Sequence, residues 1–260
     1  MRVRQFGFFN GTGFVTLYIK EVRRFINVAT QTILAPMITA LLFLAVFALA
    51  LGRAPLANGV SYGSFLAPGL IMMVMTQNAF ANNSSSLLIS KIQGSIVDLL
   101  MPPLSAFETL LALALAGLTR GLVVGLSTAL AMSLFVPLAF PHPAFIVFHA
   151  CAASLLLSLL GIIGGIWAEK FDHLAAVTNF VITPLAFLSG TFYSIARLPD
   201  FWHRVAHANP FFYMIDGFRY GFTGLNDGSL PAGVIVLSAV NLVLFGLCLV
   251  LFSRGYKLKA

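Results

Sequence analysis

Residues 91–108 read K-I-Q-G-S-I-V-D-L-L-M-P-P-L-S-A-F-E and form the longest stretch of mixed polarity between two long apolar segments. Pro102 and Pro103 lack backbone N–H donors and have a fixed φ, so a helix cannot run through them. A short helix from about Ser95 to Met101 fits in front of the two prolines. The stretch therefore predicts a brief helical connection between two much longer apolar helices.

The short helix within 91–108 is expected to be amphipathic. Ile96, Leu99 and Leu100 are three and four residues apart, which places them on one side of a helix. Ser95 fits the N-cap position, and Asp98, three residues later, is a weaker version of the capping-box glutamate. A helix of this kind between two membrane spans can press its apolar side against something outside the bilayer, which the pattern alone does not identify.

The composition indicates an integral membrane protein. Of the 260 residues 59% are hydrophobic and only 9% are charged, and the mean hydropathy is +0.96. A soluble domain carries roughly 25% charged residues. Cys151 and Cys248 both lie in apolar runs, which argues against a disulfide framework. The first thirty residues contain no compact apolar segment before a small-residue cleavage site, so no cleaved signal peptide is expected.

Six apolar segments are long enough to cross a membrane, since a span needs roughly 20 apolar residues to cross about 30 Å of hydrocarbon. They form a single transmembrane domain, residues 1–260, and predict an all-α integral membrane protein with six transmembrane helices. The expected spans are at about 30–51, 65–90, 109–136, 144–168, 174–194 and 231–252.

The placement of Lys and Arg predicts that both termini are cytoplasmic. Ten basic residues then lie inside and four outside, with Arg120 unassigned, which accounts for all 15. The net charge of +7 is explained by this topology and implies no nucleic-acid partner. Residues 91–108 become cytoplasmic and 195–230 extracellular. The inside set is Arg2, Arg4, Lys20, Arg23, Arg24, Lys91, Lys170, Arg254, Lys257 and Lys259, and the outside set is Arg53, Arg197, Arg204 and Arg219.

Residues 12–27 predict a basic amphipathic helix that lies in the membrane interface. Phe14, Leu17, Tyr18 and Phe25 recur at helical spacing, whereas the cations fall largely elsewhere around the helix. Such a helix turns its cations toward anionic lipid headgroups. The alternative is a charged entry to the first span.

The second and fifth spans carry polar side chains that must face protein or a wet cavity, because an unpaired polar group is costly in hydrocarbon. For any single residue, helix–helix hydrogen bonding is the simpler interpretation. Their clustering on the second span favours a translocation route instead. The candidate route residues are Gln77, Asn78, Asn82, Asn83 and Asn179.

The long connection 195–230 predicts two short helices. Pro199 can open the first and Asn209-Pro210 can close it, and the second runs over 211–222. Both are too short to span a membrane and are rich in Trp, Tyr and Phe, which suits the outer interface or a shallow re-entrant hairpin.

The outer connection and the third span each contain two charged residues that could be buried. Asp216 and Arg219 are three residues apart and can pair if they are buried. Glu108 and Arg120 are candidates for a buried charge site, but both appear close enough to the cytoplasmic end of their span to snorkel.

Enzyme chemistry has little support in the sequence. His203 and His207 are four apart and make half of a metal site, but catalytic zinc needs three protein ligands. The chain has no G-x-x-x-x-G-K-[ST], so it does not bind ATP by a P-loop. We therefore expect no catalytic, metal or cofactor-binding residues.

Three stretches resemble ABC-2 type transport permeases, the membrane subunits of ATP-driven exporters. Residues 65–73, F-L-A-P-G-L-I-M-M, look like the family's opening of its second span, and 91–108 look like its cytoplasmic connection. Residues 198–224, L-P-D-F-W-H-R-V-A-H-A-N-P-F-F-Y-M-I-D-G-F-R-Y-G-F-T-G, resemble its extracellular segment and are the most specific match. With the six spans, the resemblance covers nearly the whole chain.

The resemblance implies that 91–108 contains a coupling helix, which docks on a separate cytoplasmic ABC ATPase subunit. That subunit would bind ATP and Mg, and this chain would bind no cofactor. In the family the basic amphipathic start is an interface helix, which agrees with the pattern of 12–27. The expected ATPase-coupling residues are Gly94, Ser95, Ile96, Asp98 and Leu99.

The resemblance also implies a homodimer, or a pair with a sister permease, in the inner membrane, because one copy with six spans is half a pore. Family substrates include lipid-linked saccharides, polysaccharides and hydrophobic drugs. We therefore expect export of an amphipathic or hydrophobic substrate past an aromatic outer gate. The candidate gate residues are Trp202, Asn209, Pro210, Tyr213, Asp216, Arg219 and Tyr220.

Two other classes stay open at this point. An ion-coupled secondary transporter more often has discontinuous spans in matched halves, and the sequence shows no internal repeat. An intramembrane enzyme would depend on single ionisable residues, of which His203, His207, Glu108 and Asp216 are the first to test.

Overall fold

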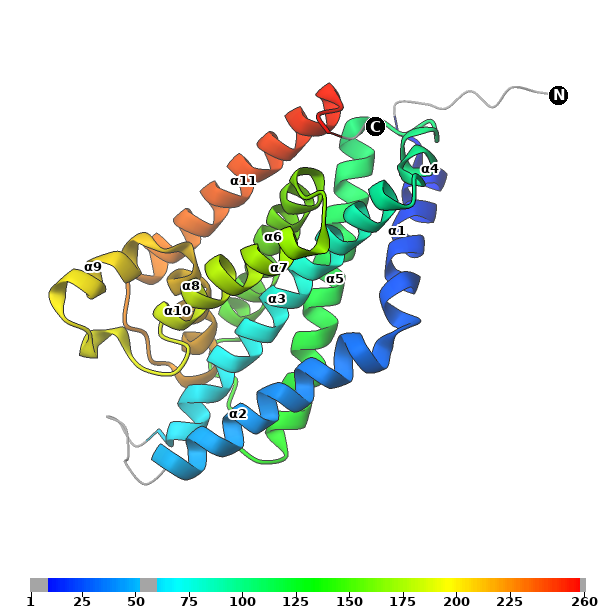
Figure 1. The fold of residues 1–260 in the computed structure, drawn as a ribbon. Helices are drawn as coiled ribbons and strands as arrows, with labels where there is room; N and C mark the ends of the chain where they lie inside the picture. Colours follow the sequence, from blue (N-terminus) through cyan, green and yellow to red (C-terminus); the bar gives the residue numbers. More distant parts are fainter. Residues whose placement is uncertain (1–8, 52–59, 258–260) are drawn as a thin grey trace.

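The computed structural model describes residues 9–51 and 60–257 (Figure 1). Arg2, Arg4, Arg53 and Lys259, which enter the topology prediction, lie outside the described residues. Within the described ranges the chain contains helices and connections but no strands, and six of its helices are long and apolar enough to cross a membrane. The all-α fold class with six transmembrane helices is therefore confirmed.

The helices follow the predicted order. The first half contains α1 (Gly11–Ile26), the π-helical turn η1 (Thr30–Leu34), α2 (Ala35–Leu51), α3 (Tyr62–Ile92), α4 (Ile96–Leu100) and α5 (Ala106–Ser133). The second half contains α6 (Pro143–Trp167), α7 (Phe171–Val177), the π-helical turn η3 (Thr178–Ile182), α8 (Thr183–Leu188), the 3₁₀ turn η4 (Ile195–Arg197), α9 (Asp200–Ala208), α10 (Pro210–Thr223) and α11 (Leu230–Arg254).

Helix α3 runs through the middle of the bundle and is almost wholly buried, mainly against α5 and α6 (Figure 1). Small residues permit this close packing: a Cβ added at Gly161 of α6 would lie 2.4 Å from the carbonyl oxygen of Phe80 on α3. By contrast, α2, the α7–α8 span and α11 are mostly exposed. These three spans therefore offer the faces that lipid or another protein must cover.

The fifth span is shorter than predicted. It covers Phe171–Leu188 rather than 174–194, because Gly190 turns the chain at a φ of +81° that only glycine adopts freely. The residues after this turn, Thr191 to Ser194, carry no charge and include Phe192 and Tyr193, so composition alone placed the end too late.

The first and fifth spans share a local feature. In each, a π-helical turn of five residues lies directly before a proline region, with Pro36 after η1 and Pro184 after η3. A proline cannot donate to the carbonyl group four residues earlier, which loosens the preceding turn. Both spans therefore carry a built-in irregularity at which they can bend.

The two outer helices form as predicted. The Asn209 side chain caps α10 by accepting from the Phe211 backbone N–H at 3.1 Å, and Gly224 ends α10 with a φ of +70°. Residues Phe201 and Trp202 of α9 are exposed, whereas Ala206 is buried. The aromatic side of α9 therefore faces away from the protein.

The predicted pairing of Asp216 with Arg219 is wrong. Both side chains are buried, but in the described chain their charged ends do not meet. Arg219 donates to the carbonyl oxygens of Gly190 at 2.6 Å and Phe65 at 3.2 Å. Asp216 accepts from the backbone N–H groups of Asp227 at 2.7 Å and Gly228 at 3.1 Å. Backbone groups from distant segments take the place of the local partner.

The prediction that Glu108 and Arg120 snorkel is also wrong. Glu108 is buried and accepts from the backbone N–H groups of Ser105 and Asn10. Arg120 is buried in the middle of α5, which continues through it without a break, and donates to Asn78 of α3 at 3.0 Å. Its distance from either helix end is too large for the side chain to reach water.

Both described ends of the chain lie at the same end of the bundle as α4. Asn10 contacts Pro103 and Glu108, and Lys257 donates to Glu169, in the connection after α6, at 3.1 Å. That ammonium holds the pKa of the exposed Glu169 carboxyl below its usual range. The connections at this end are therefore tied to the chain's first and last helices.

Candidate functional site

The connection between α3 and α5 has the predicted short helix, α4, with Ser95 at its N-cap and Met101 at its C-cap. Gly94 turns the chain at a φ of +71° with open space around it. Ser95 occupies the N-cap position, but its hydroxyl makes no capping hydrogen bond, which corrects the predicted cap. Helix α4 ends where the Met101 N–H bonds to Val97 at 2.8 Å, directly before the two prolines.

The two sides of α4 have different surroundings. Ile96 and Leu99 are buried, and they belong to the same apolar cluster as Leu17 of α1. Leu100 is exposed, so the predicted apolar side contains two residues and not three. That side packs against this chain itself. The surface left for another protein is the opposite side, whose residues are Gly94, Val97, Asp98, Leu100 and Met101.

Helix α1 braces this connection. The Asn10 side chain accepts from the Gly13 N–H at 3.0 Å, which caps α1, and donates to the Pro103 carbonyl oxygen at 3.1 Å. The Asn10 backbone N–H donates to the Glu108 carboxylate. One asparagine thus connects the start of α1, the end of the connection and the start of α5.

Helix α5 begins with a complete capping box. The Ser105 hydroxyl accepts from the Glu108 N–H at 3.2 Å, and the Glu108 carboxylate accepts from the Ser105 N–H at 2.6 Å. Sequence reasoning did not identify Asn10 or this role of Glu108. The sequence does contain the pattern that indicates the role of Glu108, because S-A-F-E is the [ST]-x-x-E pattern of a capping box. The hydrogen bond from Asn10 to Pro103 joins residues that are 93 positions apart in the sequence, so no local sequence pattern indicates it.

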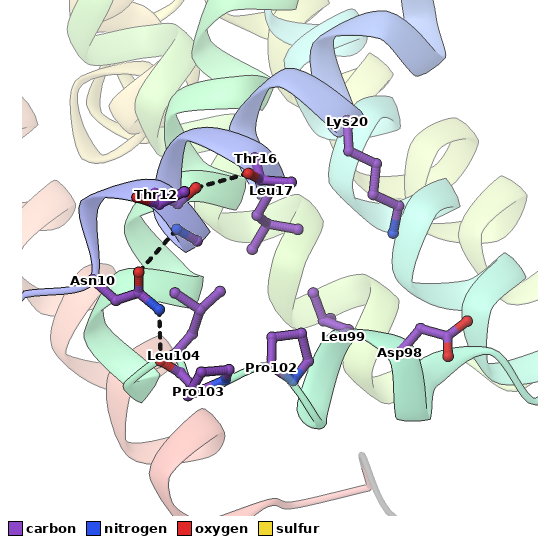
Figure 2. A pocket seen from close by; sticks show the side chains of 11 residues that line it. Asn10, Thr12, Thr16, Leu17, Lys20, Asp98, Leu99, Pro102, Pro103 and Leu104 are labelled. Atoms are coloured by element: carbon purple, nitrogen blue, oxygen red, sulfur yellow. Dashed lines mark hydrogen bonds between the residues drawn. The ribbon is translucent and has the colours of Figure 1, made fainter. Parts of the chain in front are cut away.

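A pocket of about 330 Å³ lies between α1 and the connection. Figure 2 shows α1 on one side of this pocket and residues 98–104 on the other, with Lys20 and Asp98 at one end and Asn10 at the opposite end. We call it the α1–α4 pocket. It opens beside the exposed side of α4, so the two features form one continuous surface.

The candidate route residues of α3 separate into two groups. Gln77 and Asn78 line a groove of about 250 Å³ between α2 and α3. Gln77 also donates to Thr183 of α8 at 3.3 Å, and Asn179 is exposed one turn before Thr183. We call this the α2–α3 groove, and its further lining residues include Gln31, Thr39, Phe43 and Met73.

Asn82 and Asn83 do not reach that groove in this conformation. Asn83 donates to the Ser158 hydroxyl of α6 at 2.7 Å. Asn82 accepts from Arg24 of α1 through its backbone carbonyl at 2.6 Å and its side chain at 3.1 Å. These two residues connect helices, as single polar residues in membrane spans commonly do.

The candidate gate residues are spread over two environments. Trp202 is exposed, whereas Asn209 is buried and donates to Ser189 at 2.7 Å. Tyr220 stacks on His142, with ring centroids 4.4 Å apart. Tyr213 is half-buried beside His207. Pro210 is the first residue of α10. Asp216 accepts hydrogen bonds from backbone N–H groups and Arg219 donates to backbone carbonyl oxygens, as described above.

The described residues contain no group of three His, Cys, Asp or Glu side chains that could hold a metal ion. The rings of His203 and His207 lie 4.6 Å apart, edge to face. Their surroundings provide aromatic contacts, with Phe212 next to His207.

A bundle of six helices that can cross a membrane, with a short helix between the second and third, defines a multi-pass membrane protein. Residues 12–223 match the family model of the ABC-2 type transporters. The match extends over most of the chain, so the protein belongs to the ABC-2 type transporter family. Membership makes it the membrane subunit of an ABC transporter and implies that it pairs with an ABC ATPase subunit.

Curated relatives agree with this family. The chain is 37% identical over 246 residues to "Inner membrane transport permease YadH" of Escherichia coli strain K12, covering 94% of this chain and 96% of that protein. The protein of the same name from Shigella flexneri matches equally. "Nodulation protein J" of Neorhizobium galegae is 26% identical over 191 residues, covering 70% of this chain and 71% of that protein.

Proposed function

We propose that this chain is the permease subunit of an exporter that moves an amphipathic or hydrophobic molecule out of the cytoplasm. A separate ATPase subunit binds ATP and Mg and drives the movement, while this chain binds no nucleotide and catalyses no reaction. The observation that carries the proposal is the exposed side of α4, which is turned outward while Ile96 and Leu99 on its opposite side are buried in one apolar cluster with Leu17 of α1.

The exposed side of α4 has the properties of a docking surface. Val97 and Met101 are large apolar side chains with high exposure, 50% and 77%, next to the exposed carboxylate of Asp98. Interfaces commonly place a few apolar anchors beside polar groups. Of the expected coupling residues, Gly94 and Asp98 belong to this surface, whereas Ile96 and Leu99 are buried in an apolar cluster with residues of several other helices and would act by positioning α4. Ser95 is half-buried between the two sides.

The proposed mechanism follows from the bracing. ATP binding closes the partner subunits and moves α4. Because Asn10 and Glu108 join the connection to α1 and α5, the movement passes to the spans and shifts the population from inward-facing to outward-facing. The irregular turns before Pro36 and Pro184 are points where the first and fifth spans can bend.

The proposed route runs along the α2–α3 groove. Gln31 and Asn179 are exposed on spans that are apolar on average, and lipid is a poor solvent for such amides. A second copy of the permease facing this groove would enclose them, so we propose a homodimer with the route between the copies. Membrane lipid would cover the remaining apolar faces. Trp202, Tyr213 and Tyr220 would act near the exit, and export would fall when they are replaced by Ala.

The proposed location is a bacterial inner membrane, with both termini cytoplasmic. The names of the relatives support the membrane, and the cations at the α4 end of the bundle support the orientation. A green fluorescent protein fused after residue 260 should fluoresce, and alkaline phosphatase fused there should be inactive. The reverse pattern contradicts this topology.

Co-purification in mild detergent tests the proposed function. Wild-type protein should retain a P-loop ATPase, and Asp98→Arg should lose it. Asp172→Arg is the matched control, because Asp172 is an exposed acid at the same end of the bundle. Gly94→Trp should also lose the ATPase, but Gly94 has a positive φ, so this variant needs a melting curve beside it. An ATPase that stays with Asp98→Arg, or none with the wild type, contradicts the proposal. Transport driven by an ion gradient alone would then support the secondary-transporter alternative.

A further inference from the structure

Arg120 is a cation in the middle of a membrane span with almost no protein partner. Counted from Ala106, it is the fifteenth of the 28 residues of α5, and it is 8% exposed. In the part of the chain that the structure describes, its hydrogen bonding consists of Nη2 donating to Asn78 Oδ1 at 3.0 Å, and its Nε is buried without an acceptor. A guanidinium has five N–H donors, so most of them meet no acceptor of this protein.

The charge of Arg120 is also uncompensated. Among the described residues, none of the ion pairs within 4 Å involves Arg120. The nearby carboxylate of Glu21 is already engaged, because it accepts from Arg24 at 3.0 Å and from Ser86 at 2.8 Å. Glu21 therefore neutralises Arg24 and leaves the charge of Arg120 without a counterion.

The two guanidinium groups share one face of α3. Arg120 bonds to Asn78 and Arg24 bonds to Asn82, and these asparagines are one helical turn apart. Because Glu21 already compensates Arg24, and Arg24 donates to Asn82 as well, the free donors and the uncompensated charge at this place belong to Arg120. The arrangement thus has the donors and the charge of an anion site.

The α2–α3 groove gives access to this cluster. Asn78, which holds Arg120, is itself a lining residue of the groove, and the exposed Gln31 lies on the same lining. The rest of the lining is largely apolar, with Phe43, Leu70 and Met73. Arg120 itself does not line the groove, so a ligand there meets it only when the Asn78 amide, which also donates to the Val74 carbonyl oxygen at 2.9 Å, rotates away.

We propose that Arg120, with Asn78, binds the phosphate-type head of an amphipathic molecule that lies in the α2–α3 groove. Guanidinium groups fit phosphate oxygens through paired N–H donors. The proposal rests on the proposed function and narrows its substrate class from amphipathic to anionic amphipathic. The same chemistry fits two sources, a transported molecule and a resident anionic lipid.

Binding of radiolabelled dodecyl phosphate to the purified full-length protein in a neutral maltoside detergent tests the site. The wild type should bind it saturably, and Arg120→Gln should bind about tenfold or more weakly, because a charge-assisted pair of bonds is lost. Arg120→Lys should retain most of the affinity, and Arg204→Gln, which removes an exposed cation of α9, should bind like the wild type. Equal binding by Arg120→Gln and wild type, or equal binding of zwitterionic dodecylphosphocholine, overturns the proposal.

The melting temperature of Arg120→Gln provides a second readout. It should equal or exceed that of the wild type in the absence of ligand, because an uncompensated buried charge is removed. A clear decrease would show that Arg120 is satisfied within the protein and would contradict the proposal. Neither measurement uses the ATPase, so failure here leaves the co-purification result standing.

The two sources are separated in phosphatidylcholine vesicles that contain the permease with its ATPase. If dodecyl phosphate stimulates ATP hydrolysis by the wild type but not by Arg120→Gln, the site binds the transported molecule. If phosphatidylglycerol displaces dodecyl phosphate and neither stimulates hydrolysis, the site holds a resident lipid. Both results support an anion site, whereas stimulation that is equal in the wild type and Arg120→Gln counts against it.

Discussion

The Asn10 side chain donates from Nδ2 to the carbonyl oxygen of Pro103 at 3.1 Å, across 93 residues of sequence. This contact fastens the start of α1 to the end of the connection that carries α4. The backbone of the same asparagine contacts Glu108 at the start of α5. Helix α4 is therefore no free hinge, and a force applied to it reaches α1, α3 and α5 together.

Replacement of Asn10 by Ala should destabilise the protein by about 1–2 kcal/mol, because it removes the N-cap of α1 and the bond to Pro103. Thermal melting in detergent would measure the change. Thr16→Ala is the control, since the Thr16 hydroxyl bonds only to Thr12 on an exposed turn of the same helix, and its effect should stay within about 0.5 kcal/mol. Equal melting temperatures of the two variants would contradict the bracing role.

The capping box of α5 predicts an order of stabilities. Ser105→Ala removes one acceptor and should cost about 1 kcal/mol. Glu108→Ala should cost more, because it leaves the backbone N–H groups of Ser105 and Asn10 without partners. Melting curves of both variants, with Glu169→Ala as an exposed acid at the same end, would establish the order. A Glu108→Ala variant as stable as Glu169→Ala would show that its buried bonds contribute nothing.

The two buried arginines should respond in opposite ways to replacement by Leu. Arg219→Leu leaves the carbonyl oxygens of Gly190 and Phe65 without their donor and should destabilise by about 3 kcal/mol or more. Arg120→Leu removes a charge that has one protein hydrogen bond, and should be neutral or stabilising by about 1–3 kcal/mol. Chemical or thermal unfolding of the two variants would test the contrast, and equal destabilisation would contradict it.

Glycine packing between α3 and α6 gives a further prediction. Gly161→Ala puts a methyl group against the Phe80 carbonyl oxygen and should cost about 1–3 kcal/mol. Gly246→Ala on α11 meets open space and should be neutral or stabilising by up to about 1 kcal/mol. If both variants melt at the same temperature, the close approach of α3 and α6 is not as the structure has it.

Local patterns were sufficient to predict most elements. Two prolines placed the end of α4, and Asn209-Pro210 placed the boundary between the outer helices, because both act through the backbone of adjacent residues. The six spans followed from apolar length. The end of the fifth span was placed too late, since the residues directly after Gly190 are uncharged and include two aromatic side chains, and the backbone turn at Gly190 ends the helix.

The predictions that were wrong concern contacts between segments that are far apart in the sequence. Spacing suggested that Asp216 pairs with Arg219, but Phe65 provides a competing acceptor from 154 residues away. Periodicity identified Ile96 and Leu99 as one side of α4 but could not show that α1 covers that side. The same limit applied to Arg120, whose depth within α5 depends on where the helix begins, at the Ser105 cap.

Cysteine crosslinking to the ATPase tests the central claim, that the exposed side of α4 docks on that subunit. Single cysteines would replace Val97, Asp98, Ile96 and Leu99 in turn, in a protein whose Cys151 and Cys248 have been changed to Ala. With a short bifunctional reagent, the cysteines at 97 and 98 should crosslink to the ATPase, and those at 96 and 99, which are buried against α1, should not. Crosslinking from 96 and 99 but not from 97 and 98, or from none of the four, would contradict the account.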